Sequence, residues 1–185
     1  MSNFKNRFLS GRFALLLVLI LILLGFNFSV AAKEALLRHG QIMLLELAPV
    51  DPLSLLQGYY MELDLRAERD IAAALRSSAY DAPDQREGLA VMRENGGVSQ
   101  FVRIHQGEGL AEGERLLAFK IRDNADSWRG SQVRISSGSF FFEEGQADEY
   151  DRARYALLRV SPDGAALIAD LCDADKNIIR PVRSE

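Results

Sequence analysis

The longest apolar run of the chain lies near its N-terminus, from Phe13 to Ala32, and only Asn27 and Ser29 interrupt it. About twenty helical residues, with a rise of about 1.5 Å each, span roughly 30 Å, the thickness of the hydrocarbon core of a bilayer. Helix-forming residues continue to Gly40, which is the expected stop. The pattern predicts a basic cytoplasmic segment over residues 1–12 and a transmembrane helix with a helical extension over residues 13–39.

A cleaved signal peptide is the alternative interpretation of this run. The purest apolar part ends at Phe26 and is short for a membrane span, and Ser29-Val30-Ala31 has the small-x-small pattern of a cleavage site. We favour retention as an anchor, because the helix-forming sequence passes this site without a break. Both interpretations export the remainder of the chain. Basic residues and no acidic one precede the run, so we expect a cytoplasmic N-terminus and a periplasmic, extracytoplasmic domain at the inner membrane.

Beyond Gly40 the apolar residues change from a helical to an alternating period, which predicts strands. A first strand is expected over residues 41–47 and a second over residues 59–66, separated by APVDP, in which neither proline can donate to a ladder. We expect the second strand to be central in its sheet. The segment 67–79 has the spacing of an amphipathic helix. On the second strand, alternation places four residues on one inward face: Tyr59, Met61, Leu63 and Leu65.

Two turn signals join pairs of later strands. ENGG contains the Asn and Gly that tolerate the positive φ of a tight hairpin, and SPDG is a type I turn with glycine in the left-handed position. Many short strands with such turns predict a mainly β fold, a small antiparallel barrel or sandwich with one or two short helices. The domain is expected over residues 40–179, before a polar tail over 180–185. Its later strands are expected over residues 89–93, 98–105, 116–122, 132–142, 154–160 and 165–172.

Two stretches of the domain carry a family resemblance. LAPVDPLSLLQGYYMELDL has the order Pro-x-Asp-Pro, a short apolar loop and then a strand similar to Gly-Asp-Tyr-x-x-Leu-x-Tyr, and GSFFFEEG follows later in the chain. The chain resembles the GDYXXLXY-domain proteins, a bacterial family of membrane-anchored proteins of unknown function. The resemblance covers about residues 34–179. The matching positions are Pro49, Asp51, Pro52, Gly58, Tyr60, Leu63, Phe141, Phe142, Glu144 and Gly145.

Two positions depart from the family pattern, since Tyr59 stands where the family has Asp and Leu65 where it has Tyr. Both are expected on the inward face beside Met61 and Leu63. The family carboxylate would therefore point inward and bond backbone groups of the loop. A position that accepts Tyr among apolar neighbours is typical of packing. We expect the motif to be structural and to contain no catalytic residue.

Charge and cysteine content limit the partners. Without the three basic residues of the N-terminal segment, the 22 Lys and Arg residues become 19 against 26 Asp and Glu residues, so the formal charge falls from −4 to −7. This balance argues against nucleic acid or anionic lipid headgroups as partners of the exported domain. Cys172 is the sole cysteine, which excludes an intrachain disulfide, and a lone cysteine is typically a small buried apolar residue.

Few residues have the spacing of a metal or catalytic site. His39 and His105 stand apart from cysteines and from suitably spaced carboxylates, and DADKN lacks the glycine and the final glutamate of a calcium loop. We expect no metal and no cofactor. The densest acidic run is a candidate docking patch for a basic partner, or a divalent-ion site. Its residues are Glu143, Glu144, Asp148, Glu149 and Asp151.

The favoured hypothesis is a non-enzymatic, membrane-anchored accessory protein, and the resemblance implies a polytopic membrane protein as its partner. No complete catalytic or cofactor set stands in a domain that is nevertheless tethered. The alternative is an extracytoplasmic module that binds a small ligand or a divalent ion. A third hypothesis is a Ser–Lys hydrolase, because membrane-bound signal peptidases share the plan of an anchor and an exported β-domain. Its candidate residues are Ser54 as nucleophile and Lys120 as base, because Lys33 is at the membrane edge and Lys176 is in the polar tail.

Overall fold

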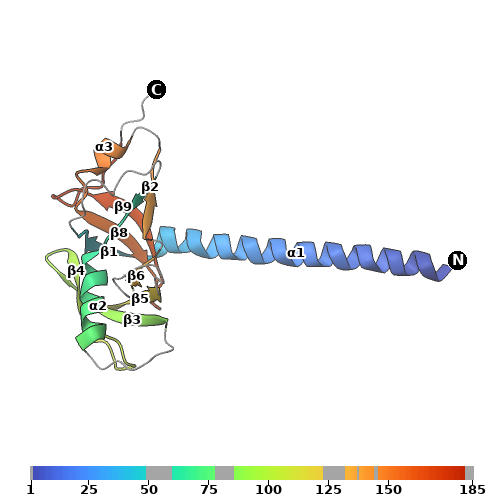
Figure 1. Cartoon of the computed structure of the whole chain (residues 1–185), viewed down its shortest axis with the longest axis horizontal. Helices are drawn as coiled ribbons and strands as arrows, with labels where there is room; N and C mark the ends of the chain where they lie inside the picture. The colour runs from blue at the N-terminus through green and yellow to red at the C-terminus, as the bar shows by residue number, and fades with distance from the viewer. Residues whose placement is uncertain are drawn as a thin grey trace.

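The computed structural model describes residues 2–48, 60–77, 86–122, 132–136, 138–143 and 146–181. Helix α1 (Ser2–His39) projects away from the β-rich part of the molecule, which contains the other elements (Figure 1). Its segment Leu15–His39 is long and apolar enough to cross a membrane, and an 18-residue window within it has a mean hydropathy of 2.7 and is 0% buried. The predicted apolar helix is confirmed, and it continues unbroken past Ser29-Val30-Ala31.

Gly40 alone separates α1 from strand β1 (Gln41–Glu46). The N–H of Gly40 donates to the carbonyl oxygen of Leu36 at 2.8 Å, and its own carbonyl oxygen accepts from Nη1 of Arg159 at 3.0 Å. A Cβ at position 40 would lie 2.5 Å from the Leu36 oxygen, so the close turn requires glycine. The predicted stop at Gly40 is confirmed, and the helix passes into the first sheet without a linker.

The first sheet is antiparallel, in the order β1-β8-β9, and contains β8 (Tyr155–Val160) and β9 (Ala166–Cys172). The SPDG turn joins β8 to β9 as predicted, and Gly164 has a φ of 90°. Met43 and Leu45 are buried in the main core, on one face of β1. The opposite face of the sheet is also covered, because a second cluster forms there from Leu44, Leu157 and Cys172.

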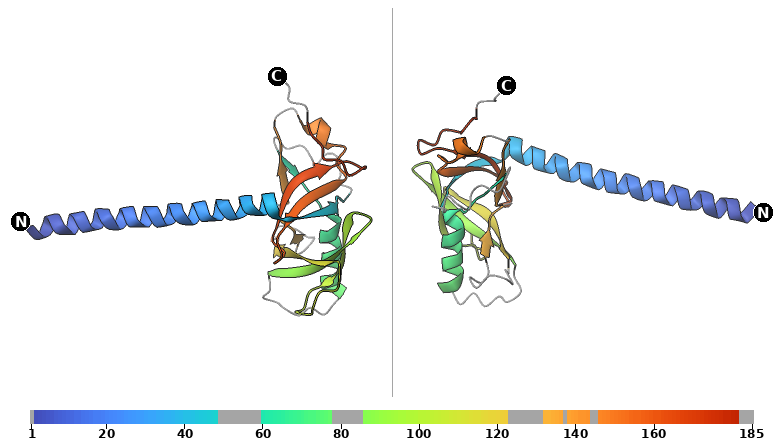
Figure 2. Two further views of the ribbon diagram at one scale, coloured as in Figure 1. Left: turned by 180° about the vertical axis from the view of Figure 1, so that it is seen from behind. Right: turned by 45° about the horizontal axis from the view of Figure 1, so that its top comes forward.

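The second sheet has four antiparallel strands in the order β4-β3-β5-β6, which are β3 (Glu87–Asn95), β4 (Val98–Ile104), β5 (Glu114–Arg122) and β6 (Gln132–Arg134). The ENGG hairpin is confirmed, because Asn95 pairs with Val98 across two glycines whose φ angles are 60° and 81°. The two sheets meet where the N–H of Ala118 donates to the carbonyl oxygen of Gly164 at 2.8 Å. The strands curl into an open half-barrel (Figure 2).

Two predicted strands are wrong in extent. The strand expected over residues 59–66 is reduced to β2 (Tyr60–Glu62), since helix α2 (Arg66–Ser77) begins directly after Leu65. β2 is not central in a sheet, because it belongs to a separate two-stranded sheet with β7 (Ser139–Phe141). The strand expected over residues 132–142 is divided into β6 and β7. Between them Ser136 and Gly138 have left-handed φ angles of 59° and 68°, which end a ladder.

The inward face of the motif strand is confirmed where the structure describes it. Met61, Leu63 and Leu65 are 3%, 2% and 0% exposed, whereas Tyr59 lies outside the described residues. The amphipathic helix is confirmed as well, with Ile71 buried on α2. With α3 (Ala147–Tyr150), two short helices accompany the strands. The fold class is therefore mainly β, as predicted, with antiparallel sheets, a half-barrel and an N-terminal apolar helix.

Candidate functional site

The two motif stretches that are far apart in the sequence are paired strands in the structure. Tyr60 of β2 pairs with Phe141 of β7, and Met61 pairs with Phe140. The N–H of Leu63 extends this pairing by donating to the carbonyl oxygen of Gly138 at 2.8 Å. Behind β7 the rings of Phe140 and Phe142 lie 5.2 and 5.4 Å from the ring of Tyr150, which is buried. Among the motif residues, Leu63 is therefore part of the main core and Phe142 packs against it, whereas Phe141 is 73% exposed.

The remaining motif residues cannot be placed in this arrangement. They are Pro49, Asp51, Pro52, Gly58, Glu144 and Gly145, and all of them lie outside the described residues. Within the predicted acidic patch, Glu143, Asp148 and Asp151 are exposed around α3, and Gln146 bonds Glu143 through both its amide atoms. The part of the chain that the structure describes contains no group of three or more His, Cys, Asp or Glu residues that could hold a metal ion. The docking role of the patch stays a prediction.

The other candidate residues have ordinary structural surroundings. Cys172 is fully buried, as predicted, and burial raises the pKa of its thiol. In DADKN the Oδ1 atom of Asp173 accepts from the N–H groups of Asp175 and Asn177 at 3.0 and 2.9 Å, which makes the loop a self-contained turn. Nδ1 of His39 lies 3.3 Å from the carbonyl oxygen of Ala35. The His105 side chain is 17% exposed, with Nδ1 3.5 Å from Oε1 of Glu108.

The Ser–Lys hypothesis receives no support from its lysine. Nζ of Lys120 lies 2.5 Å from Oε1 of Glu87, and the Lys120 side chain is 65% exposed. A lysine that acts as a general base must be desolvated enough to lose its proton near neutral pH. The Lys120 side chain is instead exposed to solvent and paired with Glu87, and Ser54 lies outside the described residues.

A buried carboxylate that the sequence did not single out lies in the first turn of α2. Oε1 of Glu68 accepts from the N–H of Ile135 at 2.7 Å, its side chain is 5% exposed, and Nη1 of Arg134 lies 3.7 Å from Oε2. Desolvation raises the pKa of Glu68 to about 7, against the lowering effects of the Ile135 N–H and of Arg134. In the sequence, Glu68 looks like an ordinary acid at a helix N-terminus, so its burial could not be predicted.

A second buried carboxylate, Glu114, is fully paired and therefore structural. Its oxygens accept from Arg93 at 2.7 Å, from Arg103 at 2.8 Å and from the N–H of Ala111 at 2.9 Å, and the side chain is 2% exposed. The hydrogen bond from Arg103 is the main reason why the pKa of Glu114 is lowered to about 2. This cluster ties β3, β4 and β5 together and leaves no carboxylate oxygen free for a ligand.

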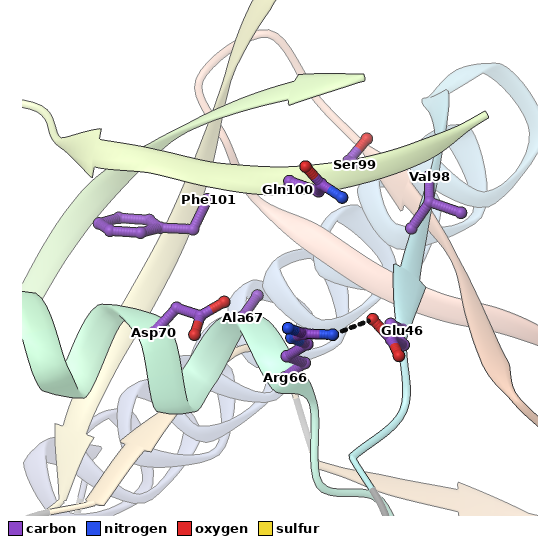
Figure 3. A pocket seen from close by; sticks show the side chains of 8 residues that line it. All are labelled: Glu46, Arg66, Ala67, Asp70, Val98, Ser99, Gln100 and Phe101. Atoms are coloured by element: carbon purple, nitrogen blue, oxygen red, sulfur yellow. Dashed lines mark hydrogen bonds and ion pairs between the residues drawn. The ribbon is translucent and has the colours of Figure 1, made fainter. Parts of the chain in front are cut away.

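A small pocket of about 200 Å³ lies between α2 and strand β4 (Figure 3). The ion pair of Arg66 with Glu46, 2.9 Å between Nη1 and Oε2, bounds it on the side of β1, and Phe101 lies beside Ala67 and Asp70 at the other end. Pockets for organic ligands typically measure about 300–1,000 Å³. The pocket is therefore too small for such a ligand, and we assign no site to it.

The larger cavity, of about 580 Å³, lies between the last two turns of α1 and the two larger sheets. It falls within the ordinary size range of ligand sites. Its walls are mainly apolar, and its polar residues include Lys33, Lys120, Arg134 and Ser136. The hydroxyl oxygen of Ser136 is buried there without a hydrogen-bond partner. Of all the surfaces formed by the described residues, this cavity is the best candidate for binding.

The comparisons with other proteins agree with the resemblance found in the sequence. A family model described as "GDYXXLXY protein" matches residues 22–171, which include the apolar end of α1 and both motif strands. Neither the curated proteins nor the solved structures compared with the chain gave a match.

Proposed function

This chain belongs to the GDYXXLXY protein family, and we propose that it is a single-pass membrane protein whose extracytoplasmic β-domain acts as a non-enzymatic accessory partner of an integral membrane protein. The observation that carries the proposal is the rigid junction at Gly40. No residue intervenes between α1 and the sheet other than this glycine, and Arg159 of the central strand β8 holds its carbonyl oxygen. The domain is therefore held at one height and in one orientation relative to α1.

Such a junction restricts the movement of the domain, which a domain without an anchor would not experience. A flexible linker would let the domain search a large volume above the membrane, whereas a rigid one restricts it to the surface near its own anchor. This restriction favours a partner in the same membrane plane, because that partner is always presented to the same face of the domain. The proposed topology has a cytoplasmic N-terminus, since the basic residues Lys5, Arg7 and Arg12 precede the apolar run.

The experiment is extraction of the tagged full chain in a mild detergent, followed by affinity purification and identification of the proteins recovered. We expect one polytopic membrane protein in near-stoichiometric amount. Photo-crosslinking residues placed at the exposed Phe141 and Asp148 locate the contact, and one placed at the exposed Asn95, on the ENGG hairpin, is the matched control. Recovery of the protein alone, with no crosslinked membrane partner at any position, contradicts the proposal.

The anchor is tested separately. Mass spectrometry of the mature N-terminus is expected to show an intact segment before Ala32. A mature chain that starts near Ala32 shows that α1 is removed as a signal sequence, and the tethered partner model then fails.

A ligand-binding module is the second proposed function, and the 580 Å³ cavity is the observation that favours it. A thermal-shift screen of the full chain with envelope metabolites separates the two functions. Stabilisation by a small molecule supports the module, and its absence together with recovery of a membrane partner supports the accessory role.

A further inference from the structure

The cavity at the base of α1 has a local charge opposite to that of the domain. Three cationic side chains line it, Lys33, Lys120 and Arg134, against the single carboxylate of Glu87 among the described lining residues. The exported part as a whole has a formal charge of −7. The net negative charge disfavours anionic partners over the surface as a whole, whereas a ligand in the cavity experiences these four groups first.

The cavity also has the position of a lipid headgroup site. Lys33 is the first charged residue after the apolar run of α1, so its ammonium group is at the level where a spanning helix leaves the hydrocarbon. The same lysine lines the cavity together with Ala165 and Leu167, at the start of β9. If α1 spans the bilayer, the cavity opens at the height of the headgroups.

The walls suit an amphiphile better than a free ion. Leu89, Phe119 and Leu167 give apolar surface from three different strands, and the cavity is larger than an isolated phosphate needs. At the polar side, the hydroxyl of Ser136 is buried without a partner, in a left-handed backbone conformation with φ of 59°. A buried hydroxyl that lacks a partner costs free energy unless a ligand or water bonds it. The residues therefore combine cations, a free hydrogen-bond donor and an apolar wall.

The geometry points to a binding site for the phosphate-bearing end of an anionic membrane phospholipid, held by Lys33, Lys120 and Ser136 with acyl-proximal atoms against Leu89 and Leu167. Nζ of Lys120 has Glu87 as its partner, and both side chains are well exposed, so a phosphate can share or replace this pair. Lys33 has no ion-pair partner in the portion of the chain that the structure describes. The inference rests on the proposed anchoring, because α1 must bring the cavity to the bilayer surface.

The test uses the full chain in detergent micelles and native mass spectrometry after addition of phosphatidylglycerol or phosphatidylcholine with the same acyl chains. We expect phosphatidylglycerol to bind more tightly. The double variant Lys33→Gln/Lys120→Gln is expected to lose about thirtyfold in apparent affinity for phosphatidylglycerol, and each single variant about fivefold, since a basic residue near a membrane surface contributes about 1 kcal/mol. Ala165→Trp, which narrows the exposed side of the cavity without a change of charge, is expected to weaken binding as well.

Lys176→Gln is the control for each single lysine variant, because it removes one positive charge at the opposite end of β3, where Nζ donates to the carbonyl oxygen of Gly96. Circular dichroism of each variant checks that the domain is folded. Equal binding of the two lipids, or an equal loss in Lys176→Gln, overturns the inference. Displacement of the lipid by inorganic phosphate at the same concentration overturns the lipid assignment, since the apolar wall would then contribute nothing. A mature chain that begins at Ala32 contradicts the anchoring proposal. Equal binding of both lipids by an intact chain contradicts only the lipid-site inference.

Discussion

The ring of Phe119 covers Gly88, its direct partner in the pairing of β3 with β5, so closely that a Cβ at position 88 would lie 2.5 Å from Cζ of the ring. Phe119 is 2% exposed, so its burial depends on the missing side chain opposite. The same two residues form part of the wall of the cavity at the base of α1. Packing of the second sheet and the shape of the candidate site are therefore set by one cross-strand contact.

Gly88→Ala is expected to destabilise the domain by about 1–3 kcal/mol, because the new methyl group overlaps the Phe119 ring and forces it out of its packed position. Urea titration of residues 40–185 measures the free energy of unfolding. Gly109→Ala is the control, since a Cβ there meets nothing within 4 Å and the φ is ordinary. It is expected to change stability by less than about 0.5 kcal/mol. A neutral Gly88→Ala would mean that Phe119 can leave its position without loss.

The carbonyl oxygen of Gly164 accepts the hydrogen bond that links the two larger sheets. Its replacement allows the effect of the positive φ to be separated from the effect of the close contact. Gly164→Ala places a side chain at a φ of 90° and 3.1 Å from both the Ala118 nitrogen and Cδ2 of Leu89, so we expect a loss of about 2–4 kcal/mol. Gly113→Ala has a similar φ, 78°, with open space around it, and is expected to cost about 1–2 kcal/mol from the backbone alone. The difference between the two unfolding free energies gives the contribution of the contact. Equal losses would show that the sheets tolerate separation at this turn.

Local chemistry explains what could be predicted from the sequence. The two hairpins were predicted because ENGG and SPDG contain glycines at positions that need positive φ, and the structure has these angles at Gly96, Gly97 and Gly164. The end of α1 was predicted from Gly40 for the same kind of local reason. The strand over residues 132–142 was wrong because Ser136 adopts a left-handed φ of 59°, which a serine rarely does and which no sequence rule anticipates.

Nonlocal pairing explains what could not be predicted. The motif stretch was expected to form a central strand, yet β2 pairs with β7 about eighty residues later, and an alternating pattern shows which face is buried but not which strand is the partner. Lys33, Leu89 and Leu167 line the same cavity although they belong to three different elements, α1, β3 and β9. Glu68 has the position of an N-terminal helix acid and is buried only because the segment after β6 packs on it.

The buried Glu68 is expected to make stability depend on pH. Its pKa is raised from 4.5 to about 7, so the folded state holds a proton that the unfolded state releases between these values. Its contribution is fully present below about pH 4.5 and is lost as the pH rises through about 7, with an upper limit of about 3 kcal/mol. Glu68→Gln is expected to flatten this part of the stability profile, measured by urea titration between pH 4 and 8.

Asp70→Asn, on the exposed face of the same helix, is the control for that experiment and is expected to keep the wild-type slope. Asp170 also has a raised pKa through burial and contributes in the same direction, so the difference between wild type and Glu68→Gln isolates Glu68. An identical slope in wild type and Glu68→Gln would show that the carboxylate is ionised and compensated throughout this range.

The motif strand supplies a direct test of the packing interpretation. Leu63 is 2% exposed in the main core, and Leu63→Ala is expected to cost about 2–5 kcal/mol. Leu110→Ala, at a leucine that is 43% exposed, is expected to cost less than about 1 kcal/mol. Both are measured by urea titration. Similar losses in the two variants would mean that the Leu63 side of the motif does not stabilise the fold.

The rigid junction leads to the last prediction, which separates anchoring from positioning. Six Gly and Ser residues inserted between His39 and Gly40 allow the domain to move by roughly 13 Å relative to α1. They remove the hydrogen bond from Gly40 to Leu36, while the sheets and their core stay as they are. We therefore expect a nearly unchanged unfolding midpoint together with a several-fold lower recovery of the membrane partner. The control is the same insertion between Gly109 and Leu110, an exposed site away from α1, which should leave recovery unchanged. If the junction insertion recovers as much partner as the wild type, the interface alone orients the domain, and the direct passage from helix to sheet has no role in the function proposed for it.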